Sequence, residues 1–183
     1  NYPPELAQTH ALTFGTWIPH SGTGTGRKWG DDYQIRSAYA GGLTTQYTFL
    51  EKMEFGENLE QLKWIKKYSE EYLKVRPFLS CDFYPLTELV SGSGSWCAAQ
   101  YNRPENGDGI VQVFRRERSA YTTAVFPLFG LECGKTYQWT DADDGATWTV
   151  SGEELMDSGL RLTLPVLRTA KLYFYYEVDD ENM

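Results

Sequence analysis

The stretch that decides the fold is Val150-Ser-Gly-Glu-Glu-Leu-Met-Asp-Ser-Gly-Leu-Arg-Leu-Thr-Leu164, which belongs to a run of strand-like segments that begins near Tyr84. Its last five residues alternate apolar and polar side chains, the pattern of a half-buried strand. The same period of two recurs beyond Pro77 in segments of strand length. These segments are residues 96–101, 110–115, 121–128, 136–140, 147–150, 160–164 and 171–178.

Turn-forming sequences separate these segments. Pro104-Glu-Asn-Gly-Asp-Gly109 is a strong hairpin loop, Gly130 and Gly134 mark the next turn, and Asp141-Ala-Asp-Asp-Gly145 marks another. About seven short strands divided in this way favour an antiparallel β-sandwich of Greek-key-like order or an open barrel. We therefore expect a mainly β protein.

The first 79 residues contain too few elements to close a core alone. An uncharged segment at 6–19, which includes Leu12, Phe14 and Trp17, is predicted to be a buried strand. A glycine-rich loop is expected at 21–30, and a short extended piece at 33–43 ends in a turn at Gly41-Gly42. We expect two domains, 1–79 and 80–183, of which the first is a strand, a loop and one helix.

That helix is predicted at residues 58–76. Asn58 is a good N-cap with Gln61 three residues later, and Pro77 stops the helix at about Arg76. Apolar residues recur at spacings of three and four, at Leu59, Leu62, Ile65, Tyr68, Tyr72 and Val75. We expect this stripe to pack on the β-domain, and the remaining apolar patch to drive homo-oligomer formation.

The composition restricts the partners. A net charge of −8 argues against nucleic acid or an anionic membrane as the main partner, and leaves neutral polar ligands open. The 6 tryptophans and 13 tyrosines suit sugar stacking as well as a packed core, and core packing is the commoner use.

The targeting and cysteine patterns predict a cytoplasmic protein. The sequence as given shows no secretory leader and no apolar run near membrane-spanning length, and its start at Asn1 leaves open whether it was trimmed. Cys81, Cys97 and Cys133 form no CxxC pair, so we expect buried thiols in a reducing compartment.

No cofactor or metal is predicted. The segment Ser21-Gly-Thr-Gly-Thr-Gly-Arg-Lys28 is superficially like a phosphate-binding loop, but its lysine does not directly follow glycine and no Ser or Thr comes after it. His10 and His20 are the only histidines, they stand ten residues apart, and no cysteine cluster accompanies them.

Several short motifs occur in the order found in one enzyme family. Tyr2-Pro-Pro with His10 seven residues after Pro3, Arg36-Ser-Ala-Tyr-Ala-Gly41, the helix, and Cys81-Asp-Phe-Tyr-Pro-Leu86 together resemble the end of the catalytic barrel in the α-galactosidases of glycoside hydrolase family 36. The Trp96 strand and the run from Ser151 to Leu160 resemble that family's C-terminal β-domain. The sequence departs from the family in a longer, glycine-rich loop at 15–32 and in Cys81, where glycine is usual.

The resemblance implies a (β/α)₈ barrel that holds the sugar at the C-terminal ends of its strands, with two aspartates acting by double displacement. Both aspartates would lie upstream of this sequence, because residues 2–20 correspond to the last barrel strand and its loop, and 58–75 to the last barrel helix. The chain has adjacent carboxylates that cannot flank one glycosidic bond and that we interpret as solvated turn charges. They are Asp31-Asp32, Asp143-Asp144, Glu153-Glu154 and Asp179-Asp180.

The resemblance also implies the function. The chain is expected to be the C-terminal part of a retaining α-galactosidase-like hydrolase, or of a related transferase, that acts on α-galactoside oligosaccharides and is inactive without an N-terminal barrel portion. No catalytic residue is assigned, and Thr9, His10 and Trp17 are the candidate substrate-binding residues, with capping or local packing as the alternative role of His10. The alternative is a non-catalytic carbohydrate-binding or structural β-sandwich module that uses Trp17 or Trp148.

Overall fold

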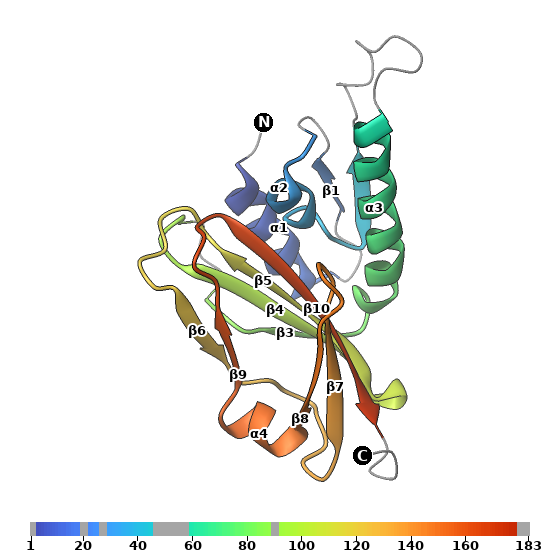
Figure 1. Ribbon diagram of the computed structural model, residues 1–183, viewed down its shortest axis with the longest axis vertical. Coiled ribbons are helices and arrows are strands. Elements are labelled where there is room, and N and C mark those ends of the chain that lie inside the picture. Colours follow the sequence, from blue (N-terminus) through green and yellow to red (C-terminus); the bar gives the residue numbers. More distant parts are fainter. Residues whose placement is uncertain (1–2, 19–21, 26–28, 46–58, 89–91, 179–183) are drawn as a thin grey trace. The chain divides into compact units, whose positions relative to one another are not determined.

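The computed structural model describes residues 3–18, 22–25, 29–45, 59–88 and 92–178. The chain divides into two compact units, residues 1–80 and 81–183, which are considered separately (Figure 1). In the part of the chain that the structure describes, the first unit holds three helices and two short strands, and the second is almost entirely β.

The helices of the first unit are α1 (Pro4–Gly15), α2 (Asp32–Arg36) and α3 (Leu59–Val75), and a single 3-10 turn at Arg76–Phe78 follows α3. The helix predicted at 58–76 thus runs from Leu59 to Val75, and Pro77 lies directly beyond its end. The apolar residues that recur along this helix are not all buried, because Leu62 is exposed while Tyr68 is buried. Asn58, the predicted N-cap, lies outside the described residues.

The buried strand predicted at 6–19 is wrong, because this segment forms α1. Pro4 occupies the first turn, where no backbone N–H is needed, and Glu5 in the same turn suits the positive end of the helix dipole. The buried residues Gln8, Ala11 and Leu12 recur at helical spacing. The expected last barrel strand at 2–20 is therefore a helix in this structure.

The extended piece predicted at 33–43 is also wrong over its first part, which forms α2. The Asp31 side chain caps this helix by accepting a hydrogen bond from the Gln34 backbone N–H at 3.0 Å. On either side of α2 lie β1 (Gly22–Thr25), inside the predicted loop, and β2 (Gly42–Thr45), and these two strands pair in parallel. A strand–helix–strand unit with parallel pairing is the element that (β/α)₈ barrels repeat.

The second unit is a β-sandwich, as predicted. Its larger sheet has six antiparallel strands in the order β3 (Asp82–Pro85), β4 (Trp96–Arg103), β5 (Asp108–Arg115), β10 (Thr169–Val178), β7 (Thr136–Asp141) and β8 (Thr147–Ser151). A smaller antiparallel pair consists of β6 (Thr123–Phe126) and β9 (Leu160–Thr163). All the strands predicted from period two are present, whereas the short β3 and the helix α4 (Gly152–Asp157) were not predicted.

The core of this unit lies between the two sheets. In Figure 1 the β6–β9 pair covers one face of the larger sheet, and α4 lies at its end. Trp139 is fully buried at the centre, with its ring 4.8 Å from that of Tyr175 and 6.1 Å from that of Trp148. The strand aromatics therefore serve mainly as core, which was the commoner of the two uses considered.

Three glycines of the predicted turns, Gly107, Gly130 and Gly145, have left-handed backbone angles. Gly107 closes the β4–β5 hairpin at φ 63°, and Gly145 lies between β7 and β8 at φ 73°. Side chains rarely adopt such angles, which explains why these turn signals were reliable.

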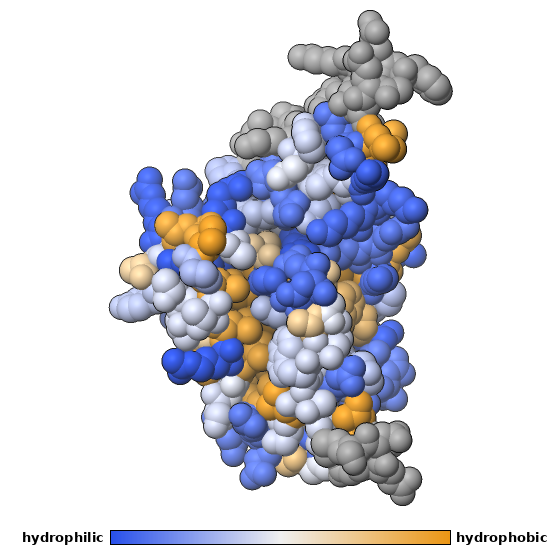
Figure 2. Space-filling model, in the orientation of Figure 1, coloured by the Kyte–Doolittle hydropathy of each residue, from blue (hydrophilic) through white to orange (hydrophobic). Residues whose placement is uncertain are grey.

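The surface seen in Figure 2 is mostly hydrophilic, with an apolar area over the connection between β9 and β10. Val166 and Leu167 in this connection are 67% and 44% exposed. Among the described residues, no helix combines the length and the apolar character that crossing a bilayer would require.

Candidate functional site

The three residues predicted to contact substrate lie on and just beyond α1. The Thr9 hydroxyl donates to the Glu5 carbonyl at 2.9 Å, a bond within the helix. His10 is exposed, with its ring edge-on to Phe14 at 5.9 Å, which fits the local-packing interpretation of this histidine. Trp17 is 83% exposed.

Three aromatic residues of this segment form a stripe on the surface of the first unit. His10, Phe14 and Trp17 follow one another at intervals of four and three residues, so they share one side of the helix and its continuation. Phe14 is 50% exposed, and the Trp17 backbone N–H donates to the Phe14 carbonyl at 2.9 Å. We call His10, Phe14 and Trp17 the aromatic stripe.

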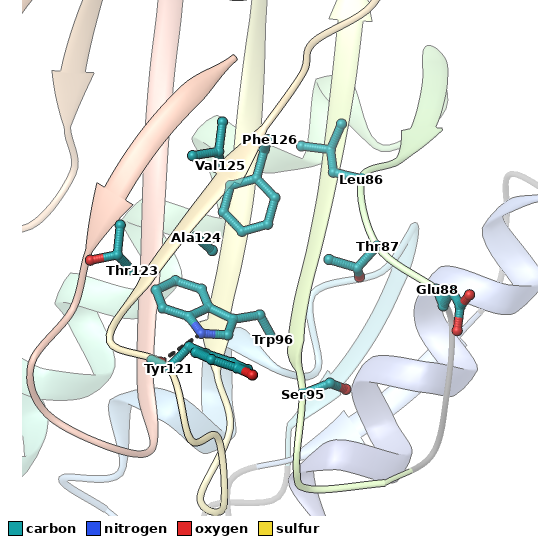
Figure 3. A pocket seen from close by; sticks show the side chains of 10 residues that line it. All are labelled: Leu86, Thr87, Glu88, Ser95, Trp96, Tyr121, Thr123, Ala124, Val125 and Phe126. Atoms are coloured by element: carbon teal, nitrogen blue, oxygen red, sulfur yellow. Dashed lines mark hydrogen bonds between the residues drawn. The ribbon is translucent and has the colours of Figure 1, made fainter. Parts of the chain in front are cut away.

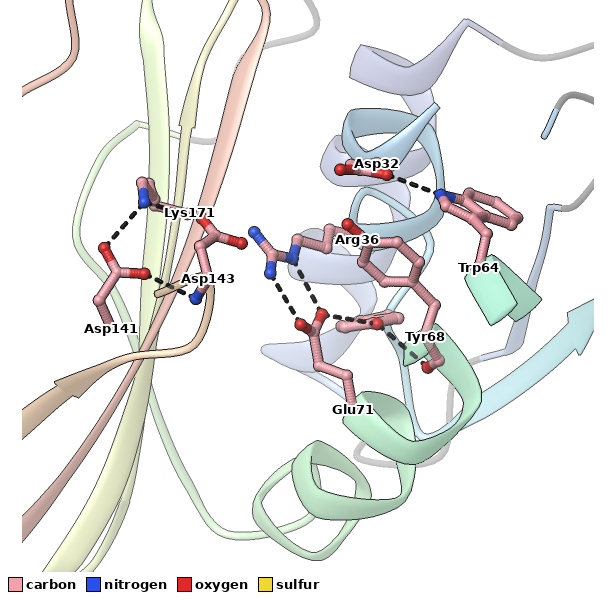
Figure 4. Close-up of polar contacts among 9 residues, drawn as sticks. Asp32, Arg36, Trp64, Tyr68, Glu71, Asp141, Asp143 and Lys171 are labelled. Atoms are coloured by element: carbon pink, nitrogen blue, oxygen red, sulfur yellow. Dashed lines mark hydrogen bonds and ion pairs between the residues drawn. The ribbon is translucent and has the colours of Figure 1, made fainter. Parts of the chain in front are cut away.

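A buried polar cluster joins α2 to α3 (Figure 4). Arg36 and Glu71 are 3% and 8% exposed and form a two-pronged ion pair. Arg36 Nε lies 2.9 Å from Glu71 Oε1, and Arg36 Nη2 lies 2.7 Å from Glu71 Oε2. The Tyr39 hydroxyl donates to Glu71 Oε1 at 2.8 Å, so both carboxylate oxygens are engaged.

Two neighbours complete the cluster. The Arg36 guanidinium lies 5.7 Å from the centre of the Tyr68 ring, a cation–π contact. The Trp64 indole N–H donates to Asp32 Oδ1 at 2.7 Å. Burial, followed by the nearby Asp32 carboxylate, raises the pKa of Tyr68, and burial together with Glu71 raises the pKa of Tyr39.

This cluster is built for stability rather than for chemistry. A general base or nucleophile needs a carboxylate oxygen that can reach substrate, and Glu71 spends both oxygens on Arg36 and Tyr39. The ion pair between Arg36 and Glu71 cannot be predicted from a local pattern, because 35 residues separate the two partners. Arg36 stood in a motif of the family resemblance, but without an assigned role.

The adjacent carboxylates do not all behave as solvated turn charges. Asp31 is a buried cap, which corrects that interpretation. Asp143 is joined with Asp141 to the Lys171 ammonium, at 2.8 Å from each (Figure 4). Burial opposes the charged form of Lys171, but the two carboxylates outweigh it and raise its pKa. Glu153 and Glu154 are exposed, whereas Asp179-Asp180 lies outside the described residues.

The cysteines correct a second prediction, since only Cys97 is fully buried. Cys81 is half-buried and Cys133 is exposed, and all three are thiols. Burial raises the pKa of the Cys97 thiol, which disfavours the reactive thiolate. Within the described ranges, no group of three His, Cys, Asp or Glu side chains is arranged to hold a metal ion.

The second unit contains a cavity of about 370 Å³ near the start of β4 (Figure 3). The Trp96 indole lies in it, 5.9 Å from the Phe126 ring, and its N–H donates to the Tyr121 carbonyl at 3.0 Å. The cavity is lined by Leu86, Thr87, Glu88, Ser95, Trp96, Tyr121, Thr123, Ala124, Val125 and Phe126. This cavity was not foreseen, because its residues come from three separate segments of the chain.

Comparison with solved structures identifies the fold. The Lactobacillus brevis α-galactosidase matches with a TM-score of 0.62 and 19% identity over 82% of this chain and 20% of its own. The chain shares the fold of part of these enzymes. Family 36 α-galactosidase AgaA from Geobacillus stearothermophilus and the galactosidase domain of the α-galactosidase–sucrose kinase AgaSK each match with a TM-score of 0.60 and 18% identity, over 79% of this chain and 19% of theirs.

The likeness confirms the fold that the motifs indicated, that of the C-terminal part of a family 36 α-galactosidase. This chain spans about a fifth of the length of the enzymes it matches. No protein-family model and no curated protein sequence matches it. The chain is therefore similar to these enzymes in fold, at a sequence identity of 18% to 19%.

Proposed function

We propose that this chain is the C-terminal part of an α-galactosidase-like retaining glycoside hydrolase and is inactive without an N-terminal barrel portion. The observation that carries the proposal is the fold match to about a fifth of each of several family 36 α-galactosidases. The parallel β1–β2 pair with α2 between its strands supports it, because (β/α)₈ barrels repeat this unit and the same chain also contains a β-sandwich.

The carboxylates of the described residues also support the proposal. A retaining glycosidase needs two carboxyl groups about 5 Å apart that flank the scissile bond. Glu71, Asp108 and Asp141 are instead paired with Arg36, Arg103 and Lys171. The catalytic aspartates would then come from the N-terminal barrel portion.

In the complete enzyme, the first unit would close the barrel and the second would support it. Thr9, His10 and Trp17 would lie near the entrance of the sugar pocket. The indole ring of Trp17 is exposed and would be available for stacking on a sugar. The substrates would be α-galactoside oligosaccharides. Two variants of one relative, AgaA from Geobacillus stearothermophilus, were solved in complex with raffinose and with stachyose.

The first test is an activity assay on the purified chain with a chromogenic α-galactoside. We expect no turnover by the chain alone, and turnover by a longer protein that adds the upstream barrel. Product analysis of the longer protein separates hydrolysis from transfer to a second sugar. Turnover by the chain alone, after purification from a host that lacks α-galactosidase, would refute the proposal.

A second candidate is a non-catalytic sugar-binding module, and the exposed aromatic stripe favours it. Trp148 is not a suitable platform, because it is partly buried and stacks on Trp139. Calorimetry with raffinose tests this candidate. Binding by the chain that Trp17→Ala abolishes would support the module, and no heat of binding would count against it.

Self-association is a further proposal. Leu59, Leu62 and Leu73 are exposed on α3, at 64%, 53% and 60%. We infer that they contribute to a contact between copies of this chain, and a strictly monomeric species in light scattering would contradict this. That α3 packs on the β-domain stays a prediction.

A further inference from the structure

We propose that the cavity at the start of β4 is a binding site for a single neutral sugar residue, carried by the β-domain itself. The choice of galactose-containing probes rests on the proposed function, but the site does not. All of its lining residues belong to the second unit. None of these lining residues belongs to the aromatic stripe.

The size of the cavity favours a small ligand. Its volume of about 370 Å³ lies at the lower end of the range for small-molecule pockets. One monosaccharide unit, or the terminal unit of an oligosaccharide, is of this size.

Two aromatic side chains at this site differ in exposure, with Trp96 mostly buried and Tyr121 mostly exposed. Trp96 is 7% exposed, and its orientation is set by the hydrogen bond from its indole N–H to the Tyr121 carbonyl and by its contact with Phe126. Tyr121 is 76% exposed at the mouth of the cavity, and Figure 3 shows its ring close to the Trp96 indole. Because such rings combine an apolar face with a polar edge, they suit the C–H face of a pyranose ring.

Two polar residues of the lining lie apart from two of its apolar residues. In Figure 3, Leu86 and Phe126 lie at one end, whereas Glu88 and Ser95 lie at the other. A ligand with one apolar face and several hydroxyl groups matches this division, because Glu88 accepts hydrogen bonds and the Ser95 hydroxyl can both donate and accept.

The charge of the site selects against anions. Among the described residues that line the cavity, Glu88 is the only charged one, and the whole chain carries a net charge of −8. A phosphate or carboxylate ligand would be repelled. A neutral polyhydroxylated ring is not repelled in this way, and its hydroxyl groups can form hydrogen bonds with Glu88 and Ser95.

The test is a titration of the ¹⁵N-labelled chain with D-galactose and with raffinose, followed by the indole N–H signals in NMR spectra. Trp96→Phe identifies the Trp96 signal, and the signals of the other tryptophans serve as internal references. We expect a saturable shift of the Trp96 signal by both sugars, with dissociation constants of about 1 mM. Inorganic phosphate at the same concentrations should produce no such shift.

Two variants with matched controls locate the site. Tyr121→Ala should raise the dissociation constant about tenfold, whereas Tyr176→Ala, which removes a 45% exposed tyrosine elsewhere in the same unit, should leave it unchanged. Glu88→Gln should weaken binding about threefold, and Glu153→Gln should not. Circular dichroism checks that each variant is folded.

The outcomes separate this site from the enzymatic proposal. The sugar site is overturned if the Trp96 signal does not move, if phosphate moves it equally, or if Tyr121→Ala and Tyr176→Ala have the same effect. If the Trp96 signal shifts saturably but the longer protein shows no α-galactosidase activity, the sugar site is supported and the enzymatic proposal is contradicted. An active longer form without the shift would do the reverse.

Discussion

The two units of the chain are stabilised in different ways. In residues 1–80, helices are tied by buried polar contacts, above all the Arg36–Glu71 pair with Tyr39. In residues 81–183, an aromatic and aliphatic core lies between two sheets, with Trp139 at its centre. A buried charge requires its particular partner, whereas an apolar core requires volume, so the two units should respond differently to single substitutions.

The largest effect is expected from Trp139→Ala. Removing this fully buried ring should lower the free energy of unfolding of the second unit by about 3–5 kcal/mol, because the cavity left behind cannot collapse completely. Urea unfolding gives the total, and hydrogen exchange of the β7 and β10 amides locates the loss. Trp17→Ala is the matched control, since an exposed side chain should change stability by no more than about 0.5 kcal/mol. Equal effects of the two variants would contradict the central place of Trp139.

The first unit should lose stability when one partner of its buried pair is removed. Glu71→Gln leaves the Arg36 charge uncompensated and should cost about 3 kcal/mol, whereas Glu60→Gln, which breaks an exposed pair with Lys63, should cost less than about 1 kcal/mol. Exchange of the α2 and α3 amides reports the change.

A variant that removes the whole polar arrangement sharpens this result. Arg36→Met, Tyr39→Phe and Glu71→Leu combined leave no buried charge, so we expect the triple variant to be more stable than Glu71→Gln alone. If the triple variant is instead the less stable of the two, the buried ion pair contributes net stability. The two units would then differ less in how they are stabilised.

The smallest effect concerns alkaline pH. Burial, followed by the Asp141 carboxylate, raises the pKa of Tyr173 to about 12 from its ordinary value of 10.0. The folded state therefore favours the neutral phenol, and its contribution to stability is complete below pH 10 and is lost as the pH rises to about 12. Unfolding midpoints of the wild type should fall over this interval, and Tyr173→Phe should make the fall shallower. An unchanged slope would show that Tyr173 does not titrate with unfolding.

Sequence reasoning succeeded in the second unit because the signals there are local. Alternation over four to eight residues marks a strand directly, and Gly107 and Gly145 occupy positions where the backbone itself demands glycine. The β-sandwich followed from these signals alone. The short strand β3 escaped because Asp82–Pro85 is only four residues long and its exposure does not alternate.

The same reasoning failed at α1 and α2 because the helix signals of these segments are confined to their first residues. The uncharged sequence at 6–19 has no clear period, and the helix start given by Pro4 and Glu5 was overlooked. Helix α2 is five residues long and depends on the Asp31 cap, which was interpreted as a solvated charge. The ion pair of Arg36 and Glu71 and the cavity around Trp96 join residues distant in sequence, and no local pattern reveals such contacts.

The parallel pair of β1 and β2 has a consequence for the order of assembly. Each strand has one edge paired with the other, and in the described part of the chain no third strand joins this sheet. Parallel sheets are usually larger and covered on both faces, so a pair alone gains little cooperativity. In the proposed longer enzyme, upstream strands would leave the ribosome first and offer their edges as a template. This pair would then complete the ring last, which makes closure of the barrel a late folding step that waits for the C-terminal fifth of the protein.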